Sequence, residues 1–258
     1  MEIRKWAIRI LSADTLEEKL LSPGKLSDHC PGKPLLWKEP VRPPGMHLHK
    51  RRKKEKLPSF QEHHQTDKRA VCLHRFAGHE LLAVEIMAYC LLAFPQAPNY
   101  FRKGLVNTLQ DEQRHVSLYI QRMKAMGLNF GDLPLYRHFW IHTPHMNSPL
   151  SFVSNVSLTF EMANLDFACM YGKSFLRNGD TKSADLMAEI LQDEISHVSF
   201  GLHWLRKLKP KQLSDWDAWR ENLSHLVSPK RAKGFVLHES YRRLAGIPED
   251  WINKLKEF

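Results

Sequence analysis

One polar phrase occurs twice in this chain, in segments that also carry apolar residues at helical spacing. The stretch LQDEQRHVSL covers residues 109–118 and LQDEISHVSF covers residues 191–200, and the two agree at seven of ten positions. Each copy has a Glu followed three residues later by a His, and residues at this spacing project from the same face of an α-helix, about one turn apart. Each copy can therefore present a carboxylate and an imidazole to one ligand, provided that its segment is helical.

Apolar residues at helical spacing predict a helical hairpin around the earlier copy. Residues 67–94 are apolar every three or four positions, and Pro95 and Pro98 end that pattern. A second helix is expected to start near Asn99 and to close at Gly127, where a glycine C-cap is typical. Because the connection is short, the two helices should be antiparallel neighbours.

The same pattern predicts a second hairpin around the later copy. Ser148 can cap a helix over residues 150–178, and Asp180 can cap the next helix over residues 181–208. The connection at residues 128–147 is long enough to run the length of a helix, and no β pattern competes. We therefore expect an all-α four-helix bundle, made of two hairpins with one long crossover and followed by short C-terminal helices.

The first helix of each predicted hairpin carries a lone acid at a matching place. Glu80 lies in HELLAVEI and Glu161 lies in FEMANLDF, and their separation along the chain nearly equals the separation of the two Glu-x-x-His copies. Each hairpin thus repeats one design, a lone acid on its first helix and Glu-x-x-His on its second. The first set is Glu80, Glu112 and His115, and the second set is Glu161, Glu194 and His197.

Four carboxylates and two imidazoles that converge in a bundle core are the ligands of a di-iron or di-manganese site. Oxygen and imidazole ligands suit iron or manganese, and the absence of thiolates from the two sets argues against structural zinc. The alternative is a buried salt-bridge network without metal, which would need cationic partners that these apolar helices do not offer. We therefore expect two metal ions, with iron favoured and manganese as the alternative.

Other residues in these helices have more ordinary interpretations. Glu85 and Asp166 each follow a lone acid by five residues, so we expect them either to bind metal or to hydrogen-bond the histidines from outside the ligand shell. His74 and His79 are interpreted as hydrogen-bonded core or surface histidines. Five aromatic residues are expected in the core, with the option that one lines a substrate pocket: Phe76, Tyr89, Tyr119, Phe160 and Trp204.

Charge and composition divide the chain into three expected regions. Of the net charge of +10, residues 1–70 carry +7, and this part is rich in Pro and Gly with one short helix near Leu11 to Leu21. We expect a basic extended arm over residues 1–67, the bundle over residues 68–209 and a helical extension over residues 210–258. The run HKRRKKEK in the arm predicts a solvated, mobile loop.

The chain has the features of a soluble cytoplasmic protein. No apolar run approaches the ~18 to 20 residues that span a bilayer, and the start MEIRKWAIRILSADTLEEKL is too charged for a signal peptide. Four cysteines occur without C-x-x-C spacing, which predicts reduced and mostly buried thiols: Cys30, Cys72, Cys90 and Cys169.

These motifs resemble the ferritin-like di-metal carboxylate superfamily and, within it, a group classed as domain of unknown function 455. The similar stretches are HELLAVEIMAYCLLAFP, DEQRH, SPLSFVSNVSLTFEMANLDFA, DEISHVSFGLHWLRKLKP and SDWDAW. The resemblance covers about residues 68–220, and the proline-rich arm more loosely. It implies Glu112 and Glu194 as bridging carboxylates, and it implies four terminal ligands: His115, His197, Glu80 and Glu161. It implies no substrate.

The function favoured by such a site is an O2-activating oxidoreductase. Two ferrous ions would reduce O2 together, and the resulting oxidant would hydroxylate or oxidise a small-molecule substrate held in an apolar pocket. No flavin or nicotinamide motif is present, so the electrons would come from a separate reductase.

Two alternatives stay open at this point. A non-catalytic iron-binding protein with a ferroxidase site is one, although the arm and the C-terminal extension would obstruct a shell of bare bundles. A transfer-RNA hydroxylase is the other, because the basic arm could attract phosphates. The arm lacks the interleaved aromatics that stack on bases, so nucleic acid is not the favoured partner.

Overall fold

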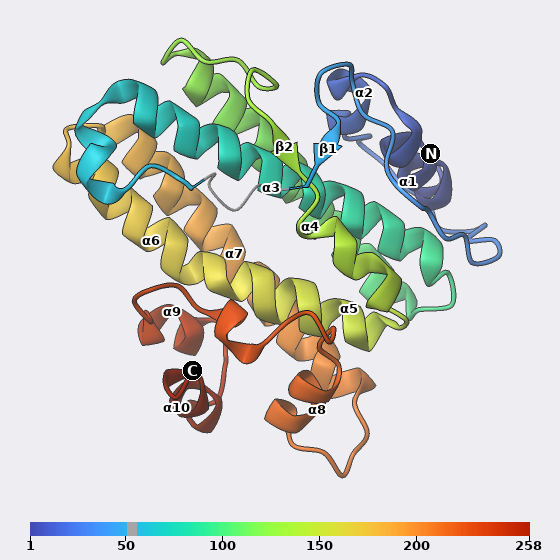
Figure 1. The fold of residues 1–258 in the computed structure, drawn as a ribbon. Helices are drawn as coiled ribbons and strands as arrows, with labels where there is room; N and C mark the ends of the chain where they lie inside the picture. The colour runs from blue at the N-terminus through green and yellow to red at the C-terminus, as the bar shows by residue number, and fades with distance from the viewer. Residues whose placement is uncertain (51–55) are drawn as a thin grey trace. The chain divides into compact units, whose positions relative to one another are not determined.

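The computed structural model describes residues 1–50 and 56–258, and helices make up most of them. The predicted all-α class is therefore confirmed. The chain divides into two compact units, Met1–Thr143 and Pro144–Phe258, and each unit holds one helical hairpin and one terminal extension (Figure 1). The loop predicted at HKRRKKEK falls mostly on residues 51–55, which lie outside the described residues.

The hairpin of the first unit consists of α3 (Thr66–Ala93) and α4 (Asn99–Lys124), which pack along each other (Figure 1). Both helices begin within one residue of the predicted start. Pro95 lies just beyond the C-cap of α3, where its missing N–H and its ring prevent continuation of the helix. Gly127 has a φ of +84°, the left-handed conformation expected after a helix C-terminus, although α4 itself ends three residues earlier.

The N-terminal extension packs on this hairpin through a helix that the sequence analysis missed. The prediction of one short helix near Leu11 to Leu21 was wrong in its start, because the structure has α1 (Ile3–Ser12) followed by α2 (Leu16–Leu20). Thr15 separates them and caps α2 by accepting a hydrogen bond from the backbone N–H of Glu18. α1 packs against α3, and its buried residues form a stripe at helical spacing: Ile3, Trp6, Ala7, Ile10 and Leu11.

The rest of the first unit contains short elements. β1 (Leu48–His49) and β2 (Leu135–Tyr136) pair in parallel, with Leu48 opposite Leu135, where no β structure was predicted. The strands are two residues long, so they join the extension to the segment after α4 without changing the fold class. The 3-10 helix η1 (Phe60–His64) precedes α3. After β2 comes η2 (Trp140–His145), which begins in the first unit and ends in the second.

The hairpin of the second unit has a composite first helix. α5 (Pro149–Asn155), η3 (Val156–Glu161) and α6 (Met162–Arg177) follow one another without a break, and α6 packs along α7 (Thr181–Leu208). The predicted caps are present, because Ser148 and Asp180 accept hydrogen bonds from backbone N–H groups of the helices that they start. η3 is a π-helix, a wider turn that the sequence analysis did not predict.

Four short helices form the C-terminal extension. They are α8 (Asp215–Glu221), η4 (Pro229–Ala232), α9 (Glu239–Leu244) and α10 (Glu249–Lys256). α8 contacts α5 and α7, and η4 contacts η3. The extension therefore packs on both helices of the second hairpin.

α3 corrects the expectation that no segment is long and apolar enough to span a bilayer. Among the described residues, it is long and apolar enough to cross a bilayer by length and composition alone, although no run of that kind was expected. Within its most apolar window, 89% is buried inside the structure. Such burial is typical of a core helix, and it is consistent with a soluble protein.

The predicted core residues are buried. This holds for each of the five aromatic residues: Phe76, Tyr89, Tyr119, Phe160 and Trp204. Three of the four cysteines are buried as well, and Cys30 is exposed. Burial raises the pKa of the Cys72 thiol to about 12, so this cysteine is a protonated core residue at neutral pH.

Candidate metal centre

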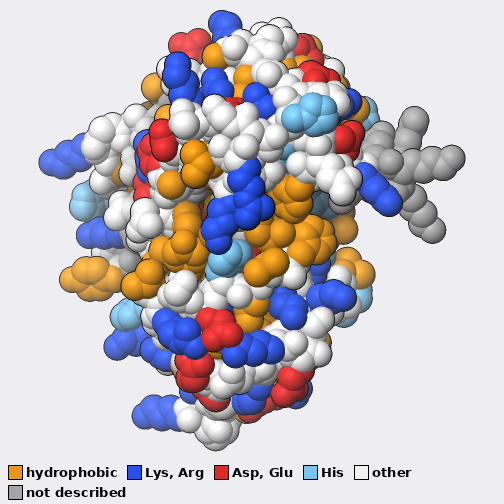
Figure 2. All heavy atoms as spheres, turned by 90° about the vertical axis from the view of Figure 1, so that its left-hand side faces the viewer, with side chains coloured by type: hydrophobic (Ala, Val, Ile, Leu, Met, Phe, Trp, Pro, Cys, Tyr) orange, Lys and Arg blue, Asp and Glu red, His pale blue; other side chains and the backbone are white. Residues whose placement is uncertain are grey.

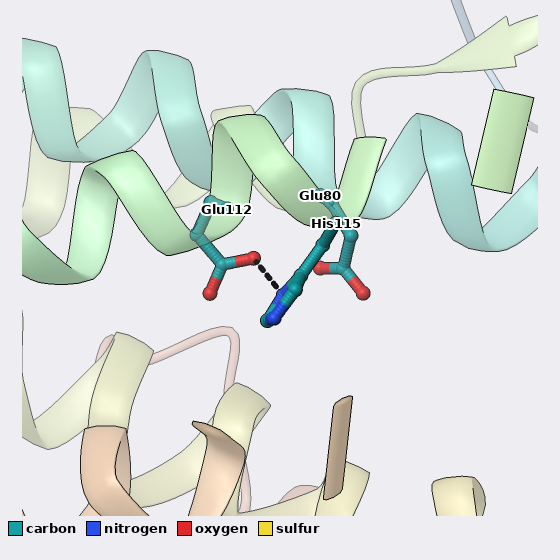
Figure 3. Close-up of side chains that lie close together, drawn as sticks. All are labelled: Glu80, Glu112 and His115. Atoms are coloured by element: carbon teal, nitrogen blue, oxygen red, sulfur yellow. Dashed lines mark hydrogen bonds and ion pairs between the residues drawn. The ribbon is translucent and has the colours of Figure 1, made fainter. Parts of the chain in front are cut away.

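Three side chains of the first unit meet at one point of the hairpin. Glu80 of α3 and Glu112 and His115 of α4 each place a potential ligand atom within 4.8 Å of the other two. Figure 3 shows the three side chains directed into the same space from two neighbouring helices. The first set predicted from the sequence is therefore brought together.

Helix register explains why Glu80 meets Glu112. Glu80 precedes Ala93, the end of α3, by the same number of positions as Glu112 follows Asn99, the start of α4. At ~1.5 Å per residue, both carboxylates lie about 20 Å from the turn that joins the helices. His115 follows one helical turn after Glu112 and lies on the same face.

The three side chains are held in a nearly dry environment. Glu112 and His115 are fully buried and Glu80 is 5% exposed. His115 Nδ1 lies 3.1 Å from Glu112 Oε2, and an Nδ1–H donor to this carboxylate fixes the tautomer that leaves the lone pair on Nε2. Glu112 therefore orients the imidazole as well as offering oxygen atoms of its own.

The donor atoms of the first set fit a divalent metal ion. Two carboxylates and one imidazole are ligands that iron and manganese accept, and no thiolate is among them. Atoms bound to one ion at ~2.1 Å lie within about 4.2 Å of each other, so small side-chain rotations would bring all three into coordination.

The second set occupies the second unit. Glu194 and His197 project from α7, with His197 Nδ1 3.8 Å from Glu194 Oε2, and Glu161 is the last residue of η3. All three side chains are buried. Asn164 donates a hydrogen bond from Nδ2 to Glu194 Oε1 at 2.8 Å. Asn164 was not predicted as a site residue, although its place three residues after Glu161 puts it on the same helix face.

Glu85 anchors the N-terminal extension. Its carboxylate accepts hydrogen bonds from Arg42, the shortest being 2.5 Å from Nη2, and lies 3.0 Å from Lys19 Nζ. All three side chains are buried. Burial lowers the pKa of the Lys19 ammonium, and the neighbouring Glu85 carboxylate opposes that shift. Within the described residues Glu85 hydrogen-bonds no histidine, so its observed partners differ from the predicted ones.

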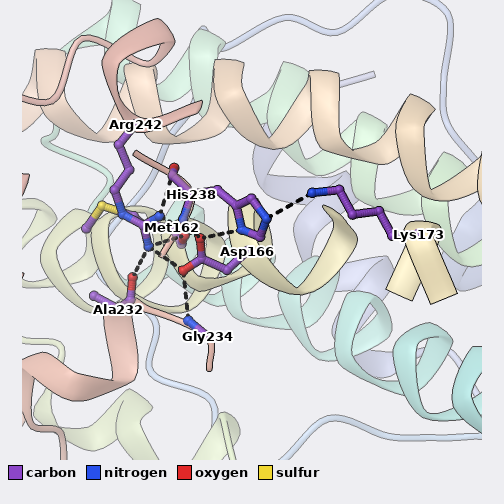
Figure 4. Close-up of polar contacts among 7 residues, drawn as sticks. All are labelled: Met162, Asp166, Lys173, Ala232, Gly234, His238 and Arg242. Atoms are coloured by element: carbon purple, nitrogen blue, oxygen red, sulfur yellow. Dashed lines mark hydrogen bonds and ion pairs between the residues drawn. The ribbon is translucent and has the colours of Figure 1, made fainter. Parts of the chain in front are cut away.

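Asp166 anchors the C-terminal extension in the same manner (Figure 4). Its carboxylate accepts hydrogen bonds from both terminal nitrogens of Arg242 at 2.8 Å, and from the backbone N–H groups of Gly234 at 2.8 Å and His238 at 2.6 Å. The His238 ring lies 3.3 Å from the same carboxylate. Within the described residues, Asp166 forms no hydrogen bond with His115 or His197. The acid five residues beyond each lone acid thus holds a terminal extension in both units.

The two histidines of α3 are not members of the set. His74 accepts a hydrogen bond from the backbone N–H of Gly131 at 3.1 Å, as expected for a core histidine, and burial lowers its pKa to about 4. The His79 ring lies 4.7 Å from the His138 ring and 5.2 Å from the Phe139 ring.

Comparison with known proteins gives a family match over nearly the whole chain. The family model described as "Protein of unknown function (DUF455)" matches residues 6–253. An "Uncharacterized protein" of Haemophilus influenzae is 25% identical over 161 residues, which cover 61% of this chain and 56% of that relative. The chain thus spans about half the length of this curated relative. No solved structure matches.

Proposed function

Because this chain belongs to the family described as "Protein of unknown function (DUF455)", whose description states no activity, we propose its function from its own residues. The proposed function is that of an oxidoreductase that uses two iron ions, or iron with manganese, to activate O2. The observation that carries it is the buried cluster of Glu80, Glu112 and His115, whose potential ligand atoms lie within 4.8 Å of one another.

Charge balance supports a cation in the first set. Removing a carboxylate from water costs several kcal/mol even after the protein has relaxed. The two carboxylates of this set are at most 5% exposed, and a divalent ion would balance their two negative charges. The hydrogen bond between His115 and Glu112 would then hold both side chains in one orientation for binding.

The internal repeat supports a second ion. Glu161, Glu194 and His197 repeat the first set at a nearly constant offset along the chain, and the anchoring acids Glu85 and Asp166 share that offset. We propose that the first set would hold one ion and the second set would hold the other in a ferritin-like four-helix bundle, where Glu112 and Glu194 would serve as carboxylate ligands. The hydrogen bond from Asn164 would orient Glu194 in that role.

Such a pair of ions, when bound, supplies the electrons for O2 reduction. The chain's own contribution is to bind and orient the ions through the two sets and to exclude water, since all six side chains are buried. The proposed substrate is a small molecule and the electron donor is a separate reductase, because the sequence has no flavin or nicotinamide motif.

Metal content tests the proposal directly. Protein purified without oxygen and loaded with ferrous iron is expected to hold two ions per chain, with X-ray absorption reporting a metal–metal distance of about 3.5 to 4 Å. Glu112→Gln should lose metal, and Glu189→Gln on the exposed surface of α7 is the matched control. One tetrahedral zinc per chain, or no metal in either protein, would refute the two-iron centre.

Oxygen consumption separates the proposed function from its alternatives. An oxidoreductase with a chemical reductant should consume O2 over many turnovers while its iron content stays at two per chain. A ferroxidase should consume O2 only as iron is added and should accumulate iron beyond that ratio.

A transfer-RNA hydroxylase should bind RNA at physiological salt. Loss of that binding when Arg51, Arg52, Lys53 and Lys54 are replaced by Ala would favour this alternative. On the face drawn in Figure 2, Lys and Arg side chains are interspersed with Asp and Glu and form no continuous basic surface. Because the arm lacks the interleaved aromatics that stack on bases, we expect only weak, salt-sensitive RNA binding.

A further inference from the structure

The π-helix η3 ends at Glu161, the lone acid of the second set. A π-turn holds about one residue more than an α-turn, so it rotates the side chains after it by roughly 100° relative to a continuous α-helix. π-helical turns are rare and need support from their surroundings. The side-chain direction of Glu161 therefore depends on whatever keeps residues 156–161 in this conformation.

Trp219 of α8 binds this segment directly. Its indole Nε1–H lies 3.1 Å from the backbone oxygen of Ser154 and 3.1 Å from Thr159 Oγ1. Thr159 Oγ1 in turn donates to the same Ser154 oxygen at 2.6 Å, across a separation of five residues. Trp219, Thr159 and Ser154 are fully buried. Trp219, Thr159 and Ser154 thus form a hydrogen-bond network that links the C-terminal extension to the π-turn.

Neighbouring contacts hold the same stretch from both ends. The Asn155 side chain donates to the backbone oxygen of Asn222 at 2.9 Å and accepts from the backbone N–H of Ser224 at 2.8 Å. Beyond the π-turn, Arg242 Nη2 lies 3.4 Å from the backbone oxygen of Met162, the residue after Glu161. The C-terminal extension therefore contacts the helix before, within and just after η3.

From these contacts we infer that Trp219 is a positioning residue for the metal centre, which holds η3 in its π-conformation and thereby aims Glu161. This inference rests on the proposed function, because it takes Glu161 to be a metal ligand. It assigns to the C-terminal extension a part in metal binding, although none of its residues belongs to either set.

The chain offers a matched control within the same tryptophan cluster. The Trp219 and Trp251 rings lie 5.1 Å apart, and both residues are fully buried. Within the described residues, the Trp251 indole N–H makes no hydrogen bond. Trp219→Phe and Trp251→Phe therefore remove similar ring volume, but only Trp219→Phe removes hydrogen bonds to the π-turn.

Two measurements test the inference. In metal-free protein, hydrogen–deuterium exchange of residues 154–162 should be faster in Trp219→Phe and unchanged in Trp251→Phe. Anaerobic titration with ferrous iron should give an affinity roughly 10- to 100-fold weaker in Trp219→Phe, the usual effect of losing a group that orients a ligand, and unchanged in Trp251→Phe. Thr159→Val should behave like Trp219→Phe, and Thr159→Ser should retain wild-type exchange and affinity because it keeps the hydroxyl.

The possible results separate this inference from the proposed function. Wild-type protein that binds no iron would refute the proposed function and with it the role of Trp219 in metal binding. Wild-type binding with equal affinities and equal exchange in both tryptophan variants would refute the inference alone. Equal weakening in both variants would also refute it, because ring packing would then be the cause. If Trp219→Phe fails to fold, the comparison of Thr159→Val with Thr159→Ser decides.

Discussion

Glu80 and Glu85 lie five residues apart on α3, and the two carboxylates contact different partners. Glu80 faces Glu112 and His115, whereas Glu85 faces Lys19 and Arg42. The sequence could predict the first arrangement because helix register and distance from the turn are local quantities. It could not predict the second, because Lys19 and Arg42 lie far before Glu85 in the sequence, and no local pattern links them to it.

Substitution of each acid should distinguish an effect on metal binding from an effect on stability. Glu80→Ala is expected to lose at least one metal ion per chain, because it removes a carboxylate from the first set. Glu85→Ala is expected to keep its metal and to lose about 3 to 5 kcal/mol of stability, because Lys19 and Arg42 would be left buried without their counter-charge. Metal-to-protein ratios and urea denaturation measure the two effects.

The exposed acid Asp67 at the start of α3 provides the control for both measurements. Asp67→Ala should keep metal and change the free energy of unfolding by no more than about 0.5 kcal/mol. Loss of metal in Glu85→Ala, with metal retained in Glu80→Ala, would show that the assignment of the two carboxylates is reversed.

His74 should make stability depend on pH. Its pKa of about 4 in the folded protein lies below the ordinary value of 6.5, so the unfolded chain binds more protons between these two pH values. The stability that comes from the neutral imidazole is therefore complete above about pH 6.5 and is lost as the pH falls toward 4. The difference in unfolding free energy between wild type and His74→Gln should shrink from pH 7 to pH 5. A difference that stays constant over this range would contradict the prediction, and His29→Gln on the surface is the control.

At the scale of the elements, the signals that ended helices were the most reliable. Proline and glycine act through their own backbone, so α3, α4 and α7 begin and end close to the predicted residues. η3 was not predicted because a π-turn depends on partners such as Trp219, which lies far beyond Glu161 in the sequence. α1 was missed for another reason, since its apolar stripe was present in the sequence but was grouped with the Pro- and Gly-rich residues that begin at Pro23.

The packing of α1 on α3 can be tested through its largest buried side chain. Trp6 is fully buried and donates its indole N–H to the backbone oxygen of Leu21 at 3.1 Å. Trp6→Ala should cost about 3 to 5 kcal/mol, because it leaves a cavity and removes the hydrogen bond. Chemical denaturation measures the loss, and Lys5→Ala on the exposed side of α1 should have little effect. Equal stability of the two variants would show that α1 contributes little to the first unit.

At the scale of the molecule, the internal repeat predicted two equivalent hairpins, and each unit contains one of them. The expected regions of residues 1–67, 68–209 and 210–258 follow composition, which changes where proline and charge are concentrated. The two units follow contacts in space, and within each unit Glu85 or Asp166 ties a terminal extension to its hairpin. Those contacts join residues that are distant in sequence, so composition alone could not reveal them.

Metal binding should stabilise the folded chain as a whole. A ligand that binds only the folded state at 100 times its Kd adds about 2.7 kcal/mol of stability. Ferrous or manganous ions are therefore expected to raise the Tm of the wild-type protein, and a chelator should reverse the shift. Glu112→Gln should show no shift, because it lacks a carboxylate of the first set. An equal rise in both proteins would indicate nonspecific binding.

The anchoring of the two extensions also has a consequence for the order of events during translation. Lys19 and Arg42 leave the ribosome before Glu85 has been synthesised, and at about 5 to 20 residues per second Arg42 precedes Glu85 by roughly 2 to 9 s. The N-terminal extension must remain solvated during that interval. Gly234, His238 and Arg242 emerge when Asp166 is already present, so the C-terminal extension can dock as soon as it is made. The N-terminal extension can therefore dock only after α3 has been synthesised, whereas the C-terminal extension is synthesised after the helix on which it docks.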